Sequence, residues 1–366
     1  MAESEQGPRR LLALDGGGIR GVLTLEVLAE LERTLQSELG RDDSFVLGDW
    51  FDYVGGTSTG AIVAAGLAQG MRVAEIQALY RRLGPDMFKK PVLPMRLWAL
   101  YRWEPLAKEL QSVFGADTTF GDRPRRALLM MVLRNATTDS PWPLANNPGA
   151  KYNQPGRPGN NLALPLWQLV RASTAAPAFF RPEVITVGDR RFTFVDGGVT
   201  AYNNPAFQLF LMATMDAYGL GWPTGEDRLL LVSVGTGTNP NADENLKLSR
   251  MHLVYNAKNV PAALMLAAQM QQDVLCRVFG RCLVGGWIDR ELEFLHDESG
   301  VLREKLFTYL RYNAELSADA LRQLGLDDVD ANAVSRLDSV DRVDDLARIG
   351  RAVARDVDPA HYRPFL

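Results

Sequence analysis

The chain has 366 residues, 46% of them hydrophobic and 23% charged, a composition that supports a sizeable folded core and argues against wholesale disorder. Forty basic residues against 44 acidic ones give a formal net charge of −4, which argues against a partner that is a nucleic-acid polymer. Two cysteines and three histidines are too few for a disulfide framework and argue against a zinc site, so we expect reduced thiols.

The first part of the chain alternates short apolar runs with helical periodicity. Residues 11–14 are apolar and precede three glycines, which predicts a buried strand, and residues 51–54 predict a second one. Leucines recur at helical spacing through residues 22–39. Residues 61–67 are small and apolar, as is typical of a helix that packs closely at the centre of a protein.

The alternation continues to residue 240. Strands are predicted at residues 127–133, 192–195 and 229–234, and helices at residues 73–82, 166–175 and 205–218. Residues 135–161 are rich in Pro, Asn and Gly, and we expect them to form a long surface loop. Strands that alternate with helices indicate an α/β fold with a mostly parallel sheet.

The pattern becomes less regular after residue 240. Residues 257–279 look helical, residues 306–312 alternate as a strand does, and the chain from residue 327 is acidic and helical. We expect a core at residues 9–240 and a mostly helical C-terminal elaboration at residues 241–366, packed together as one structural domain.

The sequence gives no sign of export or of a membrane span. The N-terminus is polar and lacks the apolar stretch of a secretory signal. No apolar run approaches the roughly 20 residues that cross a bilayer. We therefore expect a cytoplasmic protein, with any membrane contact peripheral and at the inner membrane.

A glycine-rich loop follows the first strand. Its residues are Asp15-Gly16-Gly17-Gly18-Ile19-Arg20-Gly21. Glycine lets the backbone approach a ligand, and the N–H groups at a helix start attract negative charge, so the loop is an anion site unless it is only a tight turn. One use is dinucleotide binding, because Gly16, Gly18 and Gly21 match G-x-G-x-x-G, although no ribose-binding acid follows the next strand. The other is an oxyanion hole.

A second motif, Gly56-Thr57-Ser58-Thr59-Gly60, has the form G-x-S-x-G. It lies between a predicted strand and a predicted helix, the context in which this motif puts a nucleophilic serine on a sharp turn. The start of the helix also favours negative charge on the Ser58 oxygen. The simpler interpretation is a serine or threonine that caps the helix.

A serine nucleophile needs a general base. The three histidines all lie late in the chain, and none sits in a glycine-bounded loop after a strand. Asp196 does, since it follows the strand at residues 192–195 and precedes two glycines. A carboxylate at the carboxyl end of a strand faces the edge where ligands bind in open α/β sheets, so Asp196 is predicted to take the Ser58 proton. Alone, Asp-Gly-Gly would indicate a turn.

The ordered set of these motifs resembles the patatin-like phospholipase family over roughly residues 9–240. Residues 171–177, Arg-Ala-Ser-Thr-Ala-Ala-Pro, also resemble the helix that this family carries before its Asp-Gly-Gly. The resemblance implies a three-layer α/β/α fold and a Ser–Asp dyad without histidine. It implies hydrolysis of acyl esters of phospholipids or other lipids, of the phospholipase A or lysophospholipase type, without a metal or other cofactor.

The resemblance also implies roles for individual residues. By position, Ser58 is the nucleophile and Asp196 the base of a dyad that works through an acyl-enzyme. The backbone N–H groups of Gly16, Gly17 and Gly18 form the oxyanion hole, and Arg20 supports it structurally or electrostatically.

Two segments are candidates for contact with a lipid. Residues 87–103 mix Lys, Arg, Trp, Tyr and Leu, which suits a membrane interface as well as it suits a core-packing insertion. Residues 257–279 are a candidate lid or acyl-chain wall, but core packing or a dimer face is favoured there, so a homo-oligomer stays open.

Three functional classes compete at this point. A lipid acyl hydrolase is favoured, and an oxidoreductase that uses the glycine loop is the weaker alternative. Some bacterial patatin-like proteins are antiphage effectors switched on by cyclic nucleotides, so the resemblance also permits a small nucleotide activator.

Overall fold

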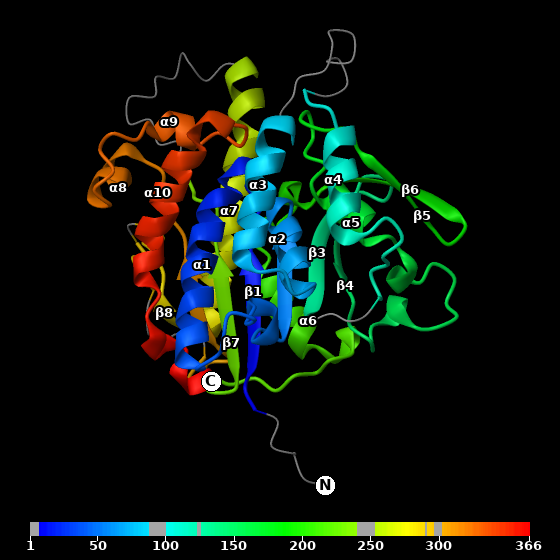
Figure 1. Ribbon diagram of the computed structural model, residues 1–366, viewed down its shortest axis with the longest axis horizontal. Coiled ribbons are helices and arrows are strands. Elements are labelled where there is room, and N and C mark those ends of the chain that lie inside the picture. Colours follow the sequence, from blue (N-terminus) through cyan, green and yellow to red (C-terminus); the bar gives the residue numbers. More distant parts are fainter. Residues whose placement is uncertain (1–6, 88–99, 123–125, 240–252, 290, 296–301) are drawn as a thin grey trace.

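The computed structural model describes residues 7–87, 100–122, 126–239, 253–289, 291–295 and 302–366 (Figure 1). Its strands are β1 (Arg9–Leu14), β2 (Tyr53–Thr57), β3 (Leu128–Asn135), β4 (Ser140–Ala145), β5 (Glu183–Val187), β6 (Arg190–Asp196), β7 (Leu229–Val234), β8 (Arg281–Val284) and β9 (Thr308–Tyr312). Its α-helices are α1 (Gly21–Glu38), α2 (Thr59–Ala68), α3 (Val73–Met87), α4 (Glu104–Phe114), α5 (Leu166–Ser173), α6 (Ala206–Thr214), α7 (Leu253–Phe279), α8 (Ala318–Gln323), α9 (Ala331–Val334) and α10 (Val343–Val353).

All nine strands form one sheet. Six of them run parallel in the order β3-β2-β1-β7-β9-β8. β4 pairs antiparallel with β3, and the β5–β6 hairpin joins β3 through β6, also antiparallel. The predicted mostly parallel α/β sheet is confirmed.

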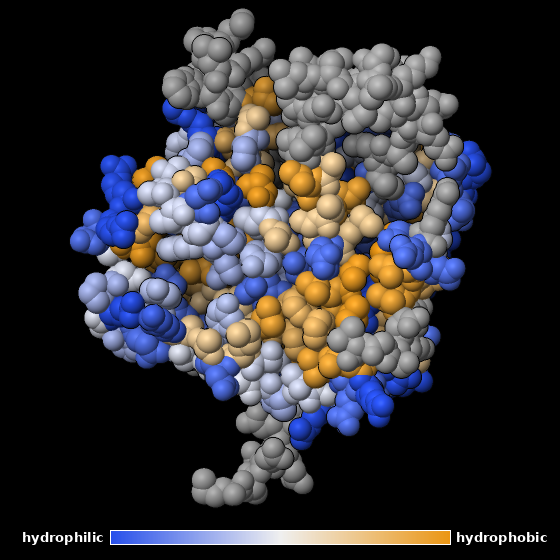
Figure 2. Space-filling view, turned by 180° about the vertical axis from the view of Figure 1, so that it is seen from behind, coloured by the Kyte–Doolittle hydropathy of each residue, from blue (hydrophilic) through white to orange (hydrophobic). Residues whose placement is uncertain are grey.

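Strand β1 shows why helices cover both faces of the sheet. Its residues 11–14 are all fully buried, and successive side chains point to opposite faces. Leu12 and Leu14 join the core beneath α1, α2, α3 and α10, whereas Leu11 and Ala13 join the core beneath α6 and α7. Figure 1 shows the first group of helices in front of the sheet, and Figure 2 views the molecule from behind, where apolar patches alternate with hydrophilic ones. The three-layer α/β/α architecture follows.

The expected long loop at residues 135–161 is partly wrong, because it contains strand β4. Prolines at positions 141 and 143 hid this strand from the sequence pattern. Proline is tolerated at the edge of a sheet because its missing N–H is not needed there. β4 pairs with β3 alone among the described strands, so it is such an edge.

The C-terminal part of the chain contributes to the same sheet. β9 confirms the strand predicted at residues 306–312, and β8 was not predicted. Both lie beyond β7, so the region after residue 240 extends the sheet as well as adding α8, α9 and α10. In the described part of the chain, we find no helix that combines the length and apolar character needed to cross a bilayer.

Candidate active site

Ser58 lies on the sharp turn between β2 and α2. Its φ is 55°, a left-handed value that strains any residue other than glycine and is typical of a nucleophile turn. Gly60 makes the turn feasible, because a Cβ at that position would lie 2.3 Å from the Leu14 carbonyl oxygen. The Ser58 N–H donates to Ser173 Oγ at 3.0 Å, and that hydroxyl donates to the Val132 carbonyl at 2.7 Å. The strained turn is therefore anchored from α5.

Asp196 reaches Ser58 because β2 and β6 meet end to end along one edge of β3. The last pair of β2 is Thr57 with Val132, and the last pair of β6 is Asp196 with Leu133, one register further along. Since β4 occupies the other edge of β3 over these residues, β6 must lie in line with β2. The residue after Thr57 and the last residue of β6 are thus brought together.

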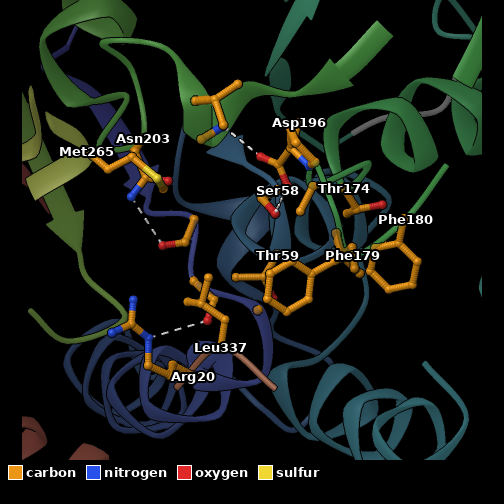
Figure 3. Close-up of a pocket in the computed structure, with 18 residues that line it drawn as sticks. Arg20, Ser58, Thr59, Thr174, Phe179, Phe180, Asp196, Asn203, Met265 and Leu337 are labelled. Atoms are coloured by element: carbon orange, nitrogen blue, oxygen red, sulfur yellow. Dashed lines mark hydrogen bonds between the residues drawn. The ribbon is translucent and has the colours of Figure 1, made fainter. Parts of the chain in front are cut away.

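The two side chains are within hydrogen-bonding distance. Ser58 Oγ donates to Asp196 Oδ2 at 2.6 Å, and the Gly198 N–H donates to the other carboxylate oxygen, also at 2.6 Å (Figure 3). The backbone N–H of Asp196 is tied to the Ala175 carbonyl at 3.0 Å. The end of α5 and the residues that follow it therefore hold both Ser58 and Asp196.

Burial sets the proton affinity of Asp196. Loss of solvation raises the pKa of this carboxyl to about 6, against the hydrogen bonds from Ser58 and Gly198 and the charge of Arg171, which lower it. The carboxyl is therefore mostly ionised at pH 7 and basic enough to accept a proton. Arg171 is itself buried, and its Nη2 donates to the Arg181 carbonyl at 2.9 Å.

The glycine loop offers two free donors and not the three that were predicted. The Gly16 N–H donates to the Asn203 carbonyl at 3.0 Å, so it is not available to an oxyanion, and the prediction for Gly16 needs correction. Within the described residues, the N–H groups of Gly17 and Gly18 have no acceptor. Gly18 has a φ of 60°, and a Cβ there would lie 2.4 Å from the Leu337 carbonyl oxygen, so only glycine fits.

Arg20 ties this loop to the C-terminal region. Its Nε donates to the Gly17 carbonyl at 3.4 Å and its Nη1 to the Ser335 carbonyl at 3.3 Å. Burial lowers the pKa of the Arg20 guanidinium to about 10, against the charge of Asp15, so the group stays protonated at neutral pH. A supporting role for Arg20 remains a prediction with which this geometry agrees.

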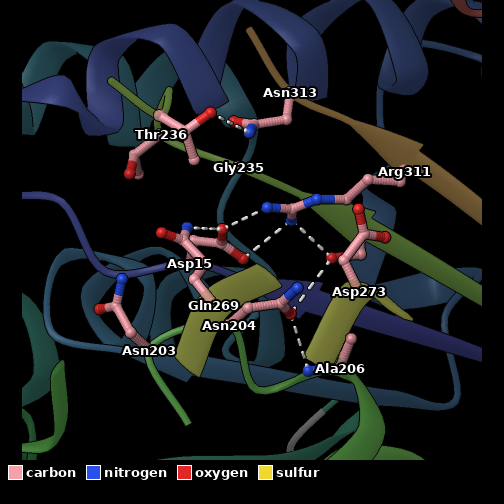
Figure 4. Close-up of polar contacts among 12 residues, drawn as sticks. Asp15, Asn203, Asn204, Ala206, Gly235, Thr236, Gln269, Asp273, Arg311 and Asn313 are labelled. Carbon is pink, nitrogen blue, oxygen red and sulfur yellow. Dashed lines mark hydrogen bonds and ion pairs between the residues drawn. The ribbon is translucent and has the colours of Figure 1, made fainter. Parts of the chain in front are cut away.

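Asp15, the first residue of the loop, is fully buried against the C-terminal part of the chain. Arg311 on β9 donates to its two carboxylate oxygens at 2.9 and 2.6 Å, and Gln269 on α7 adds a bond of 2.5 Å (Figure 4). No motif pointed to Arg311 or Gln269. The Asp15–Arg311 contact joins residues 296 positions apart, so no local pattern signals it.

A cavity of about 350 Å³ opens above Ser58 and Asp196, both of which line it. Its lining is mostly apolar, with contributions from Ile62, Pro177, Phe179, Phe180, Met265 and Leu337 (Figure 3). Met265 belongs to α7, so this helix forms part of the cavity wall, the interpretation that the sequence did not favour.

Of the segment at residues 87–103, residues 88–99 lie outside the described residues. Tyr101 is buried and donates to Asp338 Oδ2 at 2.7 Å.

A family model described as patatin-like phospholipase matches residues 12–210, more than half of the chain. The chain belongs to the patatin-like phospholipase family. Family membership removes support from the dinucleotide interpretation of Gly16, Gly18 and Gly21. So does the loop itself, because the Ile19 N–H, which would face a pyrophosphate, donates to the Leu337 carbonyl at 3.0 Å.

Two relatives within the patatin-like phospholipases are informative. The cGAMP-activated phospholipase of Vibrio cholerae is 34% identical over 209 residues, which cover 54% of this chain and 56% of the relative. The cUMP-AMP-activated phospholipase of Escherichia coli is 33% identical over 241 residues, which cover 65% of this chain and 67% of the relative. The chain thus spans about half the length of the first of these relatives.

Among solved structures, VipD from Legionella pneumophila aligns with 93% of this patatin-like chain and 67% of its own, at 16% identity. The TM-score of 0.36 is too low to support a comparison of detail.

Proposed function

We propose that this protein is a lipid acyl hydrolase in which Ser58 is the nucleophile and Asp196 the general base. The observation that carries the proposal is the 2.6 Å hydrogen bond from Ser58 Oγ to the buried Asp196 carboxylate, at the base of an apolar cavity. Membership of the patatin-like phospholipase family supports it.

The proposed reaction has two steps. Asp196 takes the Ser58 proton as the serine oxygen attacks the ester carbonyl, and the negative oxygen is bound by the N–H groups of Gly17 and Gly18. The alcohol or lysolipid leaves with the proton from Asp196, which gives an acyl-enzyme. Water then attacks this ester with Asp196 as the base and releases the fatty acid.

The cavity supports an acyl lipid as the substrate. Its mostly apolar wall suits a fatty acyl chain, which gains free energy by leaving water. Ser58, Asp196, Gly17 and Gly18 line the same cavity, so the carbonyl of a bound ester can meet the serine and the two free N–H donors there. Phospholipids are the proposed substrate class, on the strength of the family.

The decisive experiment is lipid product analysis by mass spectrometry. Wild-type protein incubated with phospholipid vesicles should release free fatty acid and lysophospholipid. Ser58→Ala and Asp196→Asn should release neither, while keeping the melting profile of a folded protein. Equal product from wild type and Ser58→Ala would refute the proposed nucleophile.

Activation by a cyclic nucleotide is a second proposal, because two relatives are a cGAMP-activated and a cUMP-AMP-activated phospholipase. In that case the purified protein should release little fatty acid alone and much more when one of these dinucleotides is added. Full activity without any nucleotide would contradict the proposal and leave the hydrolase assignment intact.

Peripheral contact with a bilayer is the third part of the proposal. Leu100, Val199 and Leu264 are 43%, 41% and 65% exposed. Val199 lines the cavity, Leu264 is next to Met265 in its wall, and the Leu100 N–H donates to the Ala178 carbonyl at 2.9 Å, between the lining residues Pro177 and Phe179. Replacing Leu100 and Leu264 together by serine should weaken co-sedimentation with phosphatidylglycerol vesicles, while hydrolysis of a soluble ester stays unchanged. Co-sedimentation equal to that of wild type would contradict this part.

A further inference from the structure

The Gly16 carbonyl accepts two hydrogen bonds from side chains. Thr236 Oγ1 donates at 2.8 Å and Asn203 Nδ2 at 3.4 Å. This carbonyl and the Gly17 N–H belong to one planar peptide and point in opposite directions. A contact that fixes the carbonyl therefore also fixes the direction of the Gly17 N–H, one of the two free donors of the glycine loop.

The loop needs such an external anchor because it carries no side chains of its own at residues 16–18. Glycine peptides rotate with little steric resistance, so the donor direction is not set locally. Thr236 fills the adjoining space: a Cβ on Gly17 would lie 2.1 Å from its hydroxyl oxygen. The hydroxyl thus both bonds to the loop and packs against it.

Thr236 is itself held firmly. It follows β7, whose last residue pairs with the last residue of β1, so the chain beyond β7 runs beside the glycine loop. Thr236 is fully buried. Its neighbours are tied to the end of β9, where the Gly235 N–H donates to the Tyr312 carbonyl at 2.8 Å and the Gly237 N–H to Asn313 Oδ1 at 2.9 Å.

We propose that Thr236 is a positioning residue that directs the Gly17 N–H toward the oxygen that becomes negative during acyl transfer. The inference rests on the proposed hydrolase function. Thr236 does not line the cavity above the dyad, so it acts through the Gly16–Gly17 peptide and not on the substrate. Asn203, which does line the cavity, supplies the longer second bond.

The test compares Thr236→Val and Thr236→Ala, which lose the hydroxyl, with Thr236→Ser, which keeps it. The matched control is Thr308→Val, since Thr308 is also buried and its hydroxyl donates to a backbone carbonyl, that of Glu226, at 2.6 Å. The readouts are kcat and KM for a p-nitrophenyl acyl ester and the inhibition constant of an alkyl trifluoromethyl ketone. In that complex Ser58 Oγ bonds to the ketone carbon, its proton passes to Asp196, and the carbonyl electron pair moves to the oxygen that the loop binds.

Loss of the hydroxyl should lower kcat by about 10- to 100-fold, less than or comparable to loss of an oxyanion donor, with KM unchanged. The inhibition constant of the ketone should rise by a similar factor, because its adduct carries the same negative oxygen. Thr236→Ser and Thr308→Val should stay within about twofold of wild type in both readouts.

Two results would overturn the inference alone: kcat of Thr236→Ala close to that of wild type, or Thr236→Ser as impaired as Thr236→Ala. If Thr236→Val does not fold, Thr236→Ala decides, because it adds no atoms to a packed site. A wild-type protein that neither hydrolyses the ester nor binds the ketone at Ser58 would instead refute the proposed function.

Discussion

The Asp196 carboxylate is enclosed by protein, accepts hydrogen bonds from Ser58 and from the Gly198 N–H, and has a pKa raised by burial to about 6. This combination separates two requirements. The hydrogen bonds fix the direction in which the carboxylate accepts a proton, and the desolvation makes it a stronger base than an exposed aspartate.

The raised pKa predicts how hydrolysis depends on pH. The base must be ionised to act, so kcat/KM should rise with pH, reach half of its plateau near pH 6 and fall about tenfold for each pH unit below that. The measurement is kcat/KM for a soluble acyl ester between pH 4 and pH 8. Half-maximal activity near pH 4, the range of an ordinary aspartate, would contradict the role of burial.

The same shift predicts that Asp196→Asn stabilises the fold while abolishing activity. Because the folded state holds the proton more tightly than the unfolded state, ionised Asp196 lowers stability above pH 6, and this cost disappears as the pH falls below about 4. The asparagine variant should gain on the order of 2–3 kcal/mol in free energy of unfolding at pH 7.5.

Urea unfolding at pH 7.5 and at pH 4.5 measures this gain, which should be clearly smaller at the lower pH. Ser58→Ala is the control, since it keeps the carboxylate and removes a hydrogen bond to it. An asparagine variant less stable than wild type at pH 7.5 would show that burial does not penalise the charge.

At the scale of elements, the sequence predicted correctly at which edge of the sheet Asp196 lies, but the strand direction behind that prediction was wrong. The prediction assumed a strand parallel to its neighbours. In the structure β6 runs antiparallel to β3, and its last residue, Asp196, pairs with Leu133 just beyond the end of β2. The hairpin that reverses it was missed, although the two-residue turn Gly188-Asp189 between β5 and β6 is a recognisable signal. The serine was predictable because its strand, turn and helix are consecutive in the chain.

Helix α7 shows where local patterns fail. Its composition favoured core packing or a dimer face, because an apolar helix looks alike whether it covers a core or a ligand cavity. The structure puts Met265 in the wall of the cavity above the dyad.

This position predicts control over acyl-chain length. Met265→Trp puts a larger side chain in the wall and so reduces the volume of the cavity. The kcat/KM for a C16 p-nitrophenyl ester should therefore fall about tenfold or more relative to that for a C4 ester. Gln271→Trp is the matched control, since this residue of the same helix is exposed and does not line the cavity. An unchanged ratio of C16 to C4 activity in Met265→Trp would exclude α7 from the acyl site.

At the scale of the whole molecule, residues far outside the matched family region hold the glycine loop. Arg311 and Gln269 bind Asp15, Thr236 binds the Gly16 carbonyl, and Leu337 binds the Ile19 N–H. None of these contacts was predicted, because each depends on β7, α7, β9 or the C-terminal segment packing against β1. A motif in the sequence predicts local structure, but it does not predict which distant residues contact that structure in the folded protein.

The buried Asp15–Arg311 pair gives a prediction about stability. Arg311→Met leaves Asp15 as an unpaired buried charge, which should cost about 3–5 kcal/mol of unfolding free energy. The double variant Asp15→Asn with Arg311→Met removes the charge and should recover most of that loss. Chemical denaturation of the three proteins measures it, and a double variant no more stable than Arg311→Met would argue against the charge as the cause.

The link between Asn203 and Gly16 has one more consequence. Asn203 lies seven residues after Asp196 and bonds to Gly16 through both its backbone carbonyl and its side chain. In the proposed mechanism, proton transfer and charge stabilisation are therefore coupled through one short stretch of chain, residues 197–203. A substitution that shifts this stretch away from the glycine loop would impair both at once, even where it leaves Ser58 untouched.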